Sequence, residues 1–315
     1  MKRISTMGLF ALLAATGCSS GPATITGAAP VAQSWAMTAG ASSHNEALQA
    51  LVFYPSSITI DAGDSITWTA PAAEPHTISF PILGQKPLPP TDPTASTPEG
   101  GTSYDGTAYV SSGFIGGGAT YKLTFPKAGT YKFYSLPQEP LAVGTVVVQA
   151  AGTNYPTSQS AYNASAAASI AADEASALTS VGTIPAFADT IAAGVSPATA
   201  GGSTSTVMRY LSGPTLVDDE SVSVKVGTTI TFANRSNNVP HTVTFPALGA
   251  SPPAGPPFQP AAGGNTYDGT ALVNSGVIPP GGTFKLTFVK AGTYPYYCLF
   301  HSGAEGMVAK ITVTP

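Results

Sequence analysis

The chain contains one long stretch of sequence twice, and this internal repeat limits its fold more than any other feature. Residues 57–68 (SITIDAGDSITW) resemble residues 221–232 (SVSVKVGTTITF). Three further pairs match at a nearly constant offset of 163 to 165 residues: PHTISFP with PHTVTFP, YDGTAYVSSGFI with YDGTALVNSGVI, and YKLTFPKAGTYKFY with FKLTFVKAGTYPYY. Repeated matches at one offset indicate two homologous domains, which we place at residues 36–150 and 206–315.

Each copy alternates apolar and polar residues with the period of two that is typical of β-strands. In the second copy, Val222, Val224 and Val226 alternate with polar residues, and glycine-containing turns such as VGT, PPGG and KAG separate such runs. Only 9 % of the residues are charged, and 34 Gly and 29 Pro suit short strands joined by many turns. The pattern predicts an all-β protein with two antiparallel sandwiches of about 100 residues each.

The segments outside the repeat have a different composition. Residues 151–205 form an Ala/Ser/Thr-rich linker, in which SQSAYNASAAASIAADEASALTSV favours either a helix, because Ala is the best helix former, or a flexible chain. Two Pro-rich segments, residues 82–101 and 247–265, occupy equivalent places in the two copies, and we expect them to be surface loops.

The first 18 residues resemble an export signal. Lys2 and Arg3 precede a short apolar run that is too short to span a bilayer, and small residues follow. The sequence ATGC, which ends at Cys18, resembles the lipobox of bacterial lipoproteins, in which this cysteine carries lipid. A plain secretory signal with an incidental cysteine is the alternative. We therefore expect an exported protein, periplasmic or on the cell surface, that residues 19–35 tether to a membrane by a lipid anchor only.

Four residues of the second copy form a candidate metal-binding set: His241, Cys298, His301 and Met307. A soft thiolate, two imidazoles and a thioether suit copper in both of its common oxidation states. At the aligned positions the first copy has Ser135 for the cysteine and Gln138 for the second histidine, and it retains only His76. We therefore predict a metal site in the second copy alone.

The segments NNVPHTVTF and TYPYYCLFHSGAEGM resemble the cupredoxin family, especially its plastocyanin-like and pseudoazurin-like blue copper proteins. The resemblance covers residues 206–315 and, in weaker form, residues 36–150, and it implies a Greek-key β-sandwich in each copy. It also implies one type 1 copper with His241, Cys298 and His301 as equatorial ligands and Met307 as the axial ligand.

The sequence departs from the family pattern at two positions. Met307 follows His301 by six residues, one more than is usual in plastocyanins, so Glu305 or a backbone carbonyl stays an alternative axial ligand. Thr242 replaces the Asn that bonds the thiolate in many relatives, and its hydroxyl is a candidate for the same contact with the sulfur. Tyr297, beside the cysteine, is a candidate for an electron route, as its counterpart is in plastocyanins.

The resemblance implies a one-electron carrier rather than an enzyme, with redox proteins such as a cytochrome, reductase or oxidase as partners and no small-molecule substrate. We expect electrons to pass through an exposed edge of His301, ringed by Pro240, Leu299, Phe300 and Ala304. The formal net charge of −4 gives no indication of nucleic-acid binding.

Two other functions remain as alternatives to electron transfer. A copper enzyme of the nitrite reductase type needs additional histidines, whereas this chain has four in total and no His-x-His pair. The other alternative is copper carriage or storage. Storage proteins usually contain many Met, Cys or His ligands, whereas this chain has five Met and two Cys.

Overall fold

The computed structural model describes residues 31–89, 92–198, 203–253 and 258–315. Residues 32–315 form one compact unit. The expected signal at residues 1–18, with Cys18, and most of the expected tether lie outside the described residues. No helix in the described part of the chain is long and apolar enough to cross a membrane.

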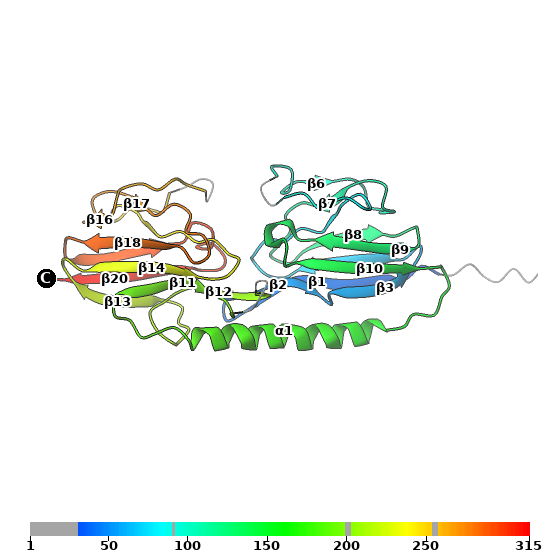
Figure 1. Ribbon diagram of the computed structural model, residues 1–315, viewed down its shortest axis with the longest axis horizontal. Helices are drawn as coiled ribbons and strands as arrows, with labels where there is room; N and C mark the ends of the chain where they lie inside the picture. Colours follow the sequence, from blue (N-terminus) through cyan, green and yellow to red (C-terminus); the bar gives the residue numbers. More distant parts are fainter. Residues whose placement is uncertain (1–30, 90–91, 199–202, 254–257) are drawn as a thin grey trace, which may run out of the picture. The chain divides into compact units, whose positions relative to one another are not determined.

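Strands of the described residues form three sheets, and the largest runs through both copies (Figure 1). It has nine strands in the order β16-β18-β14-β11-β12-β2-β1-β4-β8. Its members are β1 (Ser34–Ser43), β2 (Leu48–Tyr54), β4 (Ser65–Ala70), β8 (Ala119–Thr124), β11 (Thr190–Val195), β12 (Ser205–Leu211), β14 (Thr229–Arg235), β16 (Thr266–Tyr267) and β18 (Thr283–Phe288).

Each of the two smaller sheets belongs to a single copy. The first copy contributes six strands in the order β3-β10-β9-β5-β7-β6, and the second contributes five in the order β13-β20-β19-β15-β17. The first set is β3 (Ser57–Asp61), β5 (Ser79–Phe80), β6 (Pro98–Glu99), β7 (Val110–Ser112), β9 (Gly129–Tyr134) and β10 (Val143–Gln149), with the short 3-10 helix η1 (Leu136–Gln138) after β9. The second set is β13 (Glu220–Lys225), β15 (Thr244–Phe245), β17 (Val273–Asn274), β19 (Gly292–Tyr297) and β20 (Val308–Thr314).

The alternation in the sequence corresponds to burial in the sandwiches. Along β13, Val222 and Val224 are buried, while Ser221, Ser223 and Lys225 are exposed. Each copy has its own aromatic core: Trp68, Phe80 and Phe133 in the first, and Phe232, Phe245 and Tyr296 in the second. The predicted all-β fold with two sandwiches is therefore confirmed.

The two sandwiches are joined by backbone pairing rather than by a linker alone. Strand β2 of the first copy pairs antiparallel with β12, with Ala50 opposite Ser205 and Leu48 opposite Val207. An unpaired sheet edge exposes backbone donors and acceptors, and pairing two such edges satisfies both. The nine-stranded sheet is the result of this pairing.

The segment at 151–205 contains a helix and a strand. Helix α1 (Gln159–Val181) is capped at its N-terminus by Ser158, whose hydroxyl accepts a hydrogen bond from Ala161 N at 3.2 Å. Strand β11 pairs with β12 and β14, just as β1 pairs with β2 and β4. The second sandwich thus includes β11, which lies within the segment expected to be a linker.

Helix α1 lies along the nine-stranded sheet where the two copies meet (Figure 1). Ala177 and Val181 pack with Leu48 and Val207, which lie on the paired strands β2 and β12. The Asp173 carboxylate accepts hydrogen bonds from Tyr54 on β2 and from Thr204 beside β12. Because small alanines allow close approach to the sheet, the helix bridges the junction despite its weak apolar face.

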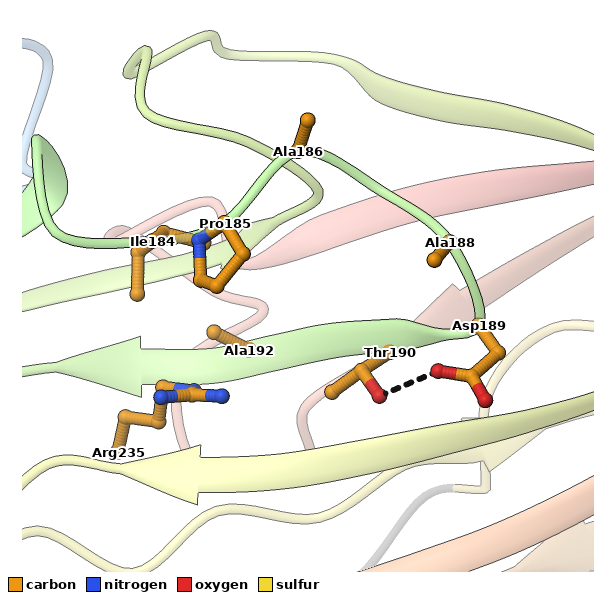
Figure 2. Close-up of a pocket in the computed structure, with 8 residues that line it drawn as sticks. All are labelled: Ile184, Pro185, Ala186, Ala188, Asp189, Thr190, Ala192 and Arg235. Atoms are coloured by element: carbon orange, nitrogen blue, oxygen red, sulfur yellow. Dashed lines mark hydrogen bonds between the residues drawn. The ribbon is translucent and has the colours of Figure 1, made fainter.

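A cavity of about 160 Å³ lies beside β11, under the segment that follows α1 (Figure 2). Ile184, Pro185, Ala192 and Arg235 line it, and Thr190 Oγ1 donates a hydrogen bond to Asp189 at its rim. None of the candidate metal-binding residues lines this cavity, so we assign it no function.

Candidate metal centre

His241 and Cys298 come from neighbouring segments of the five-stranded sheet. His241 forms two backbone hydrogen bonds with Ile278, at 3.1 and 2.7 Å, just before β15. Cys298 directly follows β19, and β15 pairs with β19 through Thr244 and Tyr297. Residues 57 positions apart in the chain are therefore placed side by side by strand pairing.

The side chains of His241, Cys298 and His301 converge on one buried point. Cys298 Sγ lies 3.7 Å from His241 Nδ1 and 3.3 Å from His301 Nδ1. The three potential ligand atoms lie within 4.8 Å of one another, and the two imidazole rings are 4.9 Å apart between centroids. Both rings present the same nitrogen to the sulfur, as a shared metal ion would require.

Burial controls the protonation of this group. It lowers the pKa of His301 to about 3 and, together with repulsion from His301, holds the pKa of His241 well below its usual value. Burial also raises the pKa of the Cys298 thiol to about 11, against hydrogen bonds from nearby backbone N–H groups. Neutral imidazoles can bind a metal without losing a proton first. The thiol, in contrast, loses its proton when a metal cation binds beside it. The donor set thus fits one type 1 copper.

A compact loop after Cys298 brings Met307 back beside Cys298. His301 N and Ser302 N donate to Cys298 O, Met307 N donates to His301 O at 2.7 Å, and Cys298 N donates to Met307 O at 3.1 Å. Met307 is fully buried in the cluster that contains Cys298. Arg209 Nη1 donates to the carbonyl of Glu305, so that carbonyl is already engaged.

Thr242 connects the two segments that carry the candidate ligands. Its backbone N–H points at Cys298 Sγ at 3.4 Å, and its hydroxyl accepts a hydrogen bond from Leu299 N at 2.7 Å. Its carbonyl accepts from the Tyr210 hydroxyl at 2.5 Å. The hydroxyl therefore supports the neighbouring backbone. Against the burial that raises the pKa of Cys298, both the N–H and the side chain of Thr242 act on the sulfur by lowering that pKa. Tyr297 is half-buried at the end of β19.

Gly194 is a site residue that the sequence pattern alone did not reveal. Its φ is +72°, and a Cβ on it would lie 2.3 Å from His241 Nε2, so the backbone of β11 lies directly against the ring. Gly40 has the same relation to His76, at 2.2 Å. The shared Ala-Gly-x-Ser pattern was the available signal, but its offset of 154 residues falls outside the main repeat.

The equivalent position in the first copy is filled by hydrogen bonds. His76 Nδ1 lies 3.2 Å from Ser135 Oγ, which donates to Gln138 Oε1 at 2.6 Å. Gln138 Nε2 donates to Glu74 Oε1 at 3.2 Å and to Pro75 O at 3.1 Å. Burial lowers the pKa of His76 to about 4, which keeps the ring neutral.

The expectation of an exposed His301 edge is wrong, because His301 is only 4 % exposed. The Glu74 carboxylate of the first copy lies 3.8 Å from His301 Nε2. Of the four residues expected around that edge, Pro240, Leu299 and Phe300 are half-buried and Ala304 is exposed. The exposed Phe258 packs edge-on against Phe300, with ring centroids 5.1 Å apart.

Comparison with known proteins matches both copies to one family. The sequence model of the copper binding proteins, plastocyanin/azurin family, matches residues 41–149 and 212–314. The chloroplastic plastocyanin of Tetradesmus obliquus is 35 % identical over 101 residues, which cover 32 % of this chain and 60 % of that protein. The plastocyanin of Scenedesmus fuscus is 34 % identical over 101 residues, covering 32 % of this chain and 89 % of its own.

Solved structures of amicyanin mutants are also similar. One, in the Cu(I) form, is 28 % identical and covers 30 % of this chain and 70 % of that chain, with a TM-score of 0.22. The match spans 60 % of the chloroplastic plastocyanin of Tetradesmus obliquus and 56 % of that of Hordeum vulgare. With two family matches that together cover most of its length, the chain belongs to the copper-binding plastocyanin/azurin family.

Proposed function

We propose that this protein is an exported one-electron carrier with a single type 1 copper in its second copy. His241, Cys298 and His301 would hold the metal equatorially, and Met307 would be the axial ligand. Copper bound there would supply a reversible one-electron couple. The observation that carries the proposal is the convergence of one buried sulfur and two Nδ1 atoms within 4.8 Å.

The surrounding residues suit a centre that changes little between oxidation states. Hydrogen bonds fix the backbone on both sides of Cys298, through Thr242, His301 and Met307. Both imidazoles are buried and neutral, so they need no proton loss before binding. A rigid ligand set has little to rearrange when an electron arrives, and a buried one keeps water away from the metal.

Tyr297 is the candidate for the electron exit. His301 is covered by the first copy, which leaves the covalent path through Cys298 to its half-buried neighbour. A redox protein, such as a cytochrome, reductase or oxidase, would dock there through a small, quickly released interface. We place the protein in a bacterial periplasm or on the cell surface, with Cys18 as its lipid anchor.

The test is the visible spectrum of residues 19–315 loaded with Cu(II), beside the Cys298→Ser variant. We expect an intense thiolate-to-copper band and one copper per chain, no band in the variant, and bleaching by a mild reductant. A colourless wild type would refute the proposal. A second tightly bound copper would favour a copper enzyme, and a blue centre that cannot be cycled reversibly would favour copper carriage.

A further inference from the structure

His301 has one ring nitrogen that the metal centre does not use, and this nitrogen faces the first copy. Nδ1 points at Cys298 Sγ, at 3.3 Å, so Nε2 is directed outward. It meets Glu74 Oε2 at 3.8 Å, and the Glu74 side chain is only 12 % exposed. This distance is longer than a hydrogen bond, and burial together with repulsion from Glu305 raises the pKa of Glu74 to about 8. A buried carboxyl group is costly without a partner, and the imidazole N–H that faces it is the available one.

In the first copy, residues at the positions equivalent to the metal ligands hold Glu74 in this place. Gln138, which stands where His301 stands in the second copy, donates from Nε2 to Glu74 Oε1. Its own oxygen accepts from Ser135, which stands where Cys298 stands and contacts His76. The residues that replaced the metal ligands thus form a hydrogen-bonded brace that ends at the carboxylate.

The carboxylate is particular to the first copy. Glu74 aligns with Val239, which is buried and packs against Leu51 and Met208. The same place before the Pro-His pair is therefore apolar in the metal-binding copy and acidic in the empty one. Because of this asymmetry, an acidic group of the empty copy faces the metal centre, whereas the equivalent residue of the metal-binding copy is apolar.

Arg209 fixes the two copies in this relation. It donates to the carbonyl of Glu305, in the loop between His301 and Met307, and to the carbonyl of Asn45 in the first copy. Met208 N donates to Ala47 O at 2.6 Å, beside the pairing of β2 with β12. The distance between Glu74 and His301 is therefore set by backbone contacts on either side.

We propose that the first copy supplies Glu74 as a positioning residue for the copper centre of the second copy. Glu74 Oε2 faces His301 Nε2 at 3.8 Å, and with copper bound it would accept the Nε2–H, which would fix the ring with its Nδ1 lone pair towards the metal. A carboxylate that accepts from a ligating histidine raises the basicity of the ligand and adds negative charge near the metal. Both effects favour the oxidised copper. This inference rests on the proposed function.

The test compares wild type with Glu74→Gln at about pH 9, above the pKa of about 8 of Glu74, where the substitution keeps the shape of the side chain and removes its charge. We expect the ratio of oxidised to reduced copper to fall about tenfold at a fixed solution potential, a rise of about 59 mV in the reduction potential. Gln138→Met, which removes the brace, should change the potential in the same direction. The control variant Glu139→Gln removes a charge from the residue that follows Gln138, and it should leave the potential unchanged.

A second readout separates positioning from simple packing. In the diamagnetic Cu(I) protein, the Nε2–H proton of His301 should give a downfield, exchange-protected NMR signal that is shifted in Glu74→Gln. If Glu74→Gln is blue but keeps both the wild-type potential and this signal, the inference is overturned while the proposed function stands. If the wild type gives no blue centre, both fail.

Discussion

Gly194→Ala offers a test of how the nine-stranded sheet supports the metal centre. Gly194 has a φ of +72°, and a Cβ there would lie 2.3 Å from His241 Nε2. The left-handed backbone alone costs about 1–2 kcal/mol for a residue other than glycine. Forcing a methyl group into a packed position adds about 1–3 kcal/mol. We expect the metal-free protein to lose about 2–5 kcal/mol of unfolding free energy, the sum of these two costs.

Two matched variants separate the causes of this loss. Gly227 has a φ of +89°, and no other atom lies within 4 Å of the place that a Cβ would take, so Gly227→Ala should show the backbone cost alone. Gly40→Ala places a methyl 2.2 Å from His76 Nε2 in the empty copy. It should destabilise the protein as much as Gly194→Ala and leave the copper spectrum intact.

The assays are urea unfolding of the metal-free protein and the visible spectrum after copper loading. Gly194→Ala should change the spectrum, because the added methyl displaces the ring of His241 relative to Cys298. If Gly194→Ala and Gly227→Ala lose equal stability, the steric part of the reasoning is refuted. If Gly40→Ala alters the spectrum as strongly as Gly194→Ala, the link between this contact and the metal centre is refuted.

Three further predictions follow from contacts around the two equivalent sites. Thr242→Val keeps the shape of the side chain but leaves Leu299 N without its acceptor, and urea unfolding should show a loss of about 1–3 kcal/mol. His76, with a pKa of about 4, stays neutral in the folded chain while it gains a proton in the unfolded chain below about pH 6.5. Stability therefore falls as the pH falls from about 6.5 to about 4, and His76→Gln should flatten the pH dependence of the unfolding free energy by about 1.4 kcal/mol per pH unit in that range. The double variant Ser135→Cys, Gln138→His restores a sulfur and an imidazole beside His76, and metal analysis should find a second copper per chain; a count of one would show that the first copy lost more than its ligands.

The repeat and the alternation of residues predicted most of the fold, because strand period and core burial are local properties. The apolar positions of β13 and the aromatic residues of both cores follow directly from the sequence. The pairing of β2 with β12 could not be predicted, since pairing between edge strands leaves no distinct pattern in either strand. Strand β11 was missed because its sequence, TIAAGV, has no alternation and is buried along nearly its whole length.

The site was more predictable than its surroundings. His241, Cys298, His301 and Met307 were proposed from their residue types and from the resemblance to the cupredoxin family, and the structure buries all four in the second copy. The exposure of His301 was predicted wrongly, because it depends on the other copy. Nothing in the residues near position 301 indicates that Glu74, 227 positions earlier, lies against the ring.

The replacements in the first copy make sense as a pair rather than as separate losses. Ser135 alone would leave a polar hydroxyl beside His76, and Gln138 alone would leave its amide oxygen without the hydrogen bond that Ser135 donates. Together they satisfy each other, His76 and one oxygen of Glu74. Hydrogen-bonded networks of this kind restrict the motion of their side chains, although His76 Nε2 has no hydrogen-bond partner among the residues that the structure describes. A copy whose metal position is filled in this way is stiffer at that end than an empty copper site would be. Glu74 lies at that end and faces His301, so a rigid network in the first copy holds the Glu74 carboxyl group at a fixed position relative to His301 in the second copy.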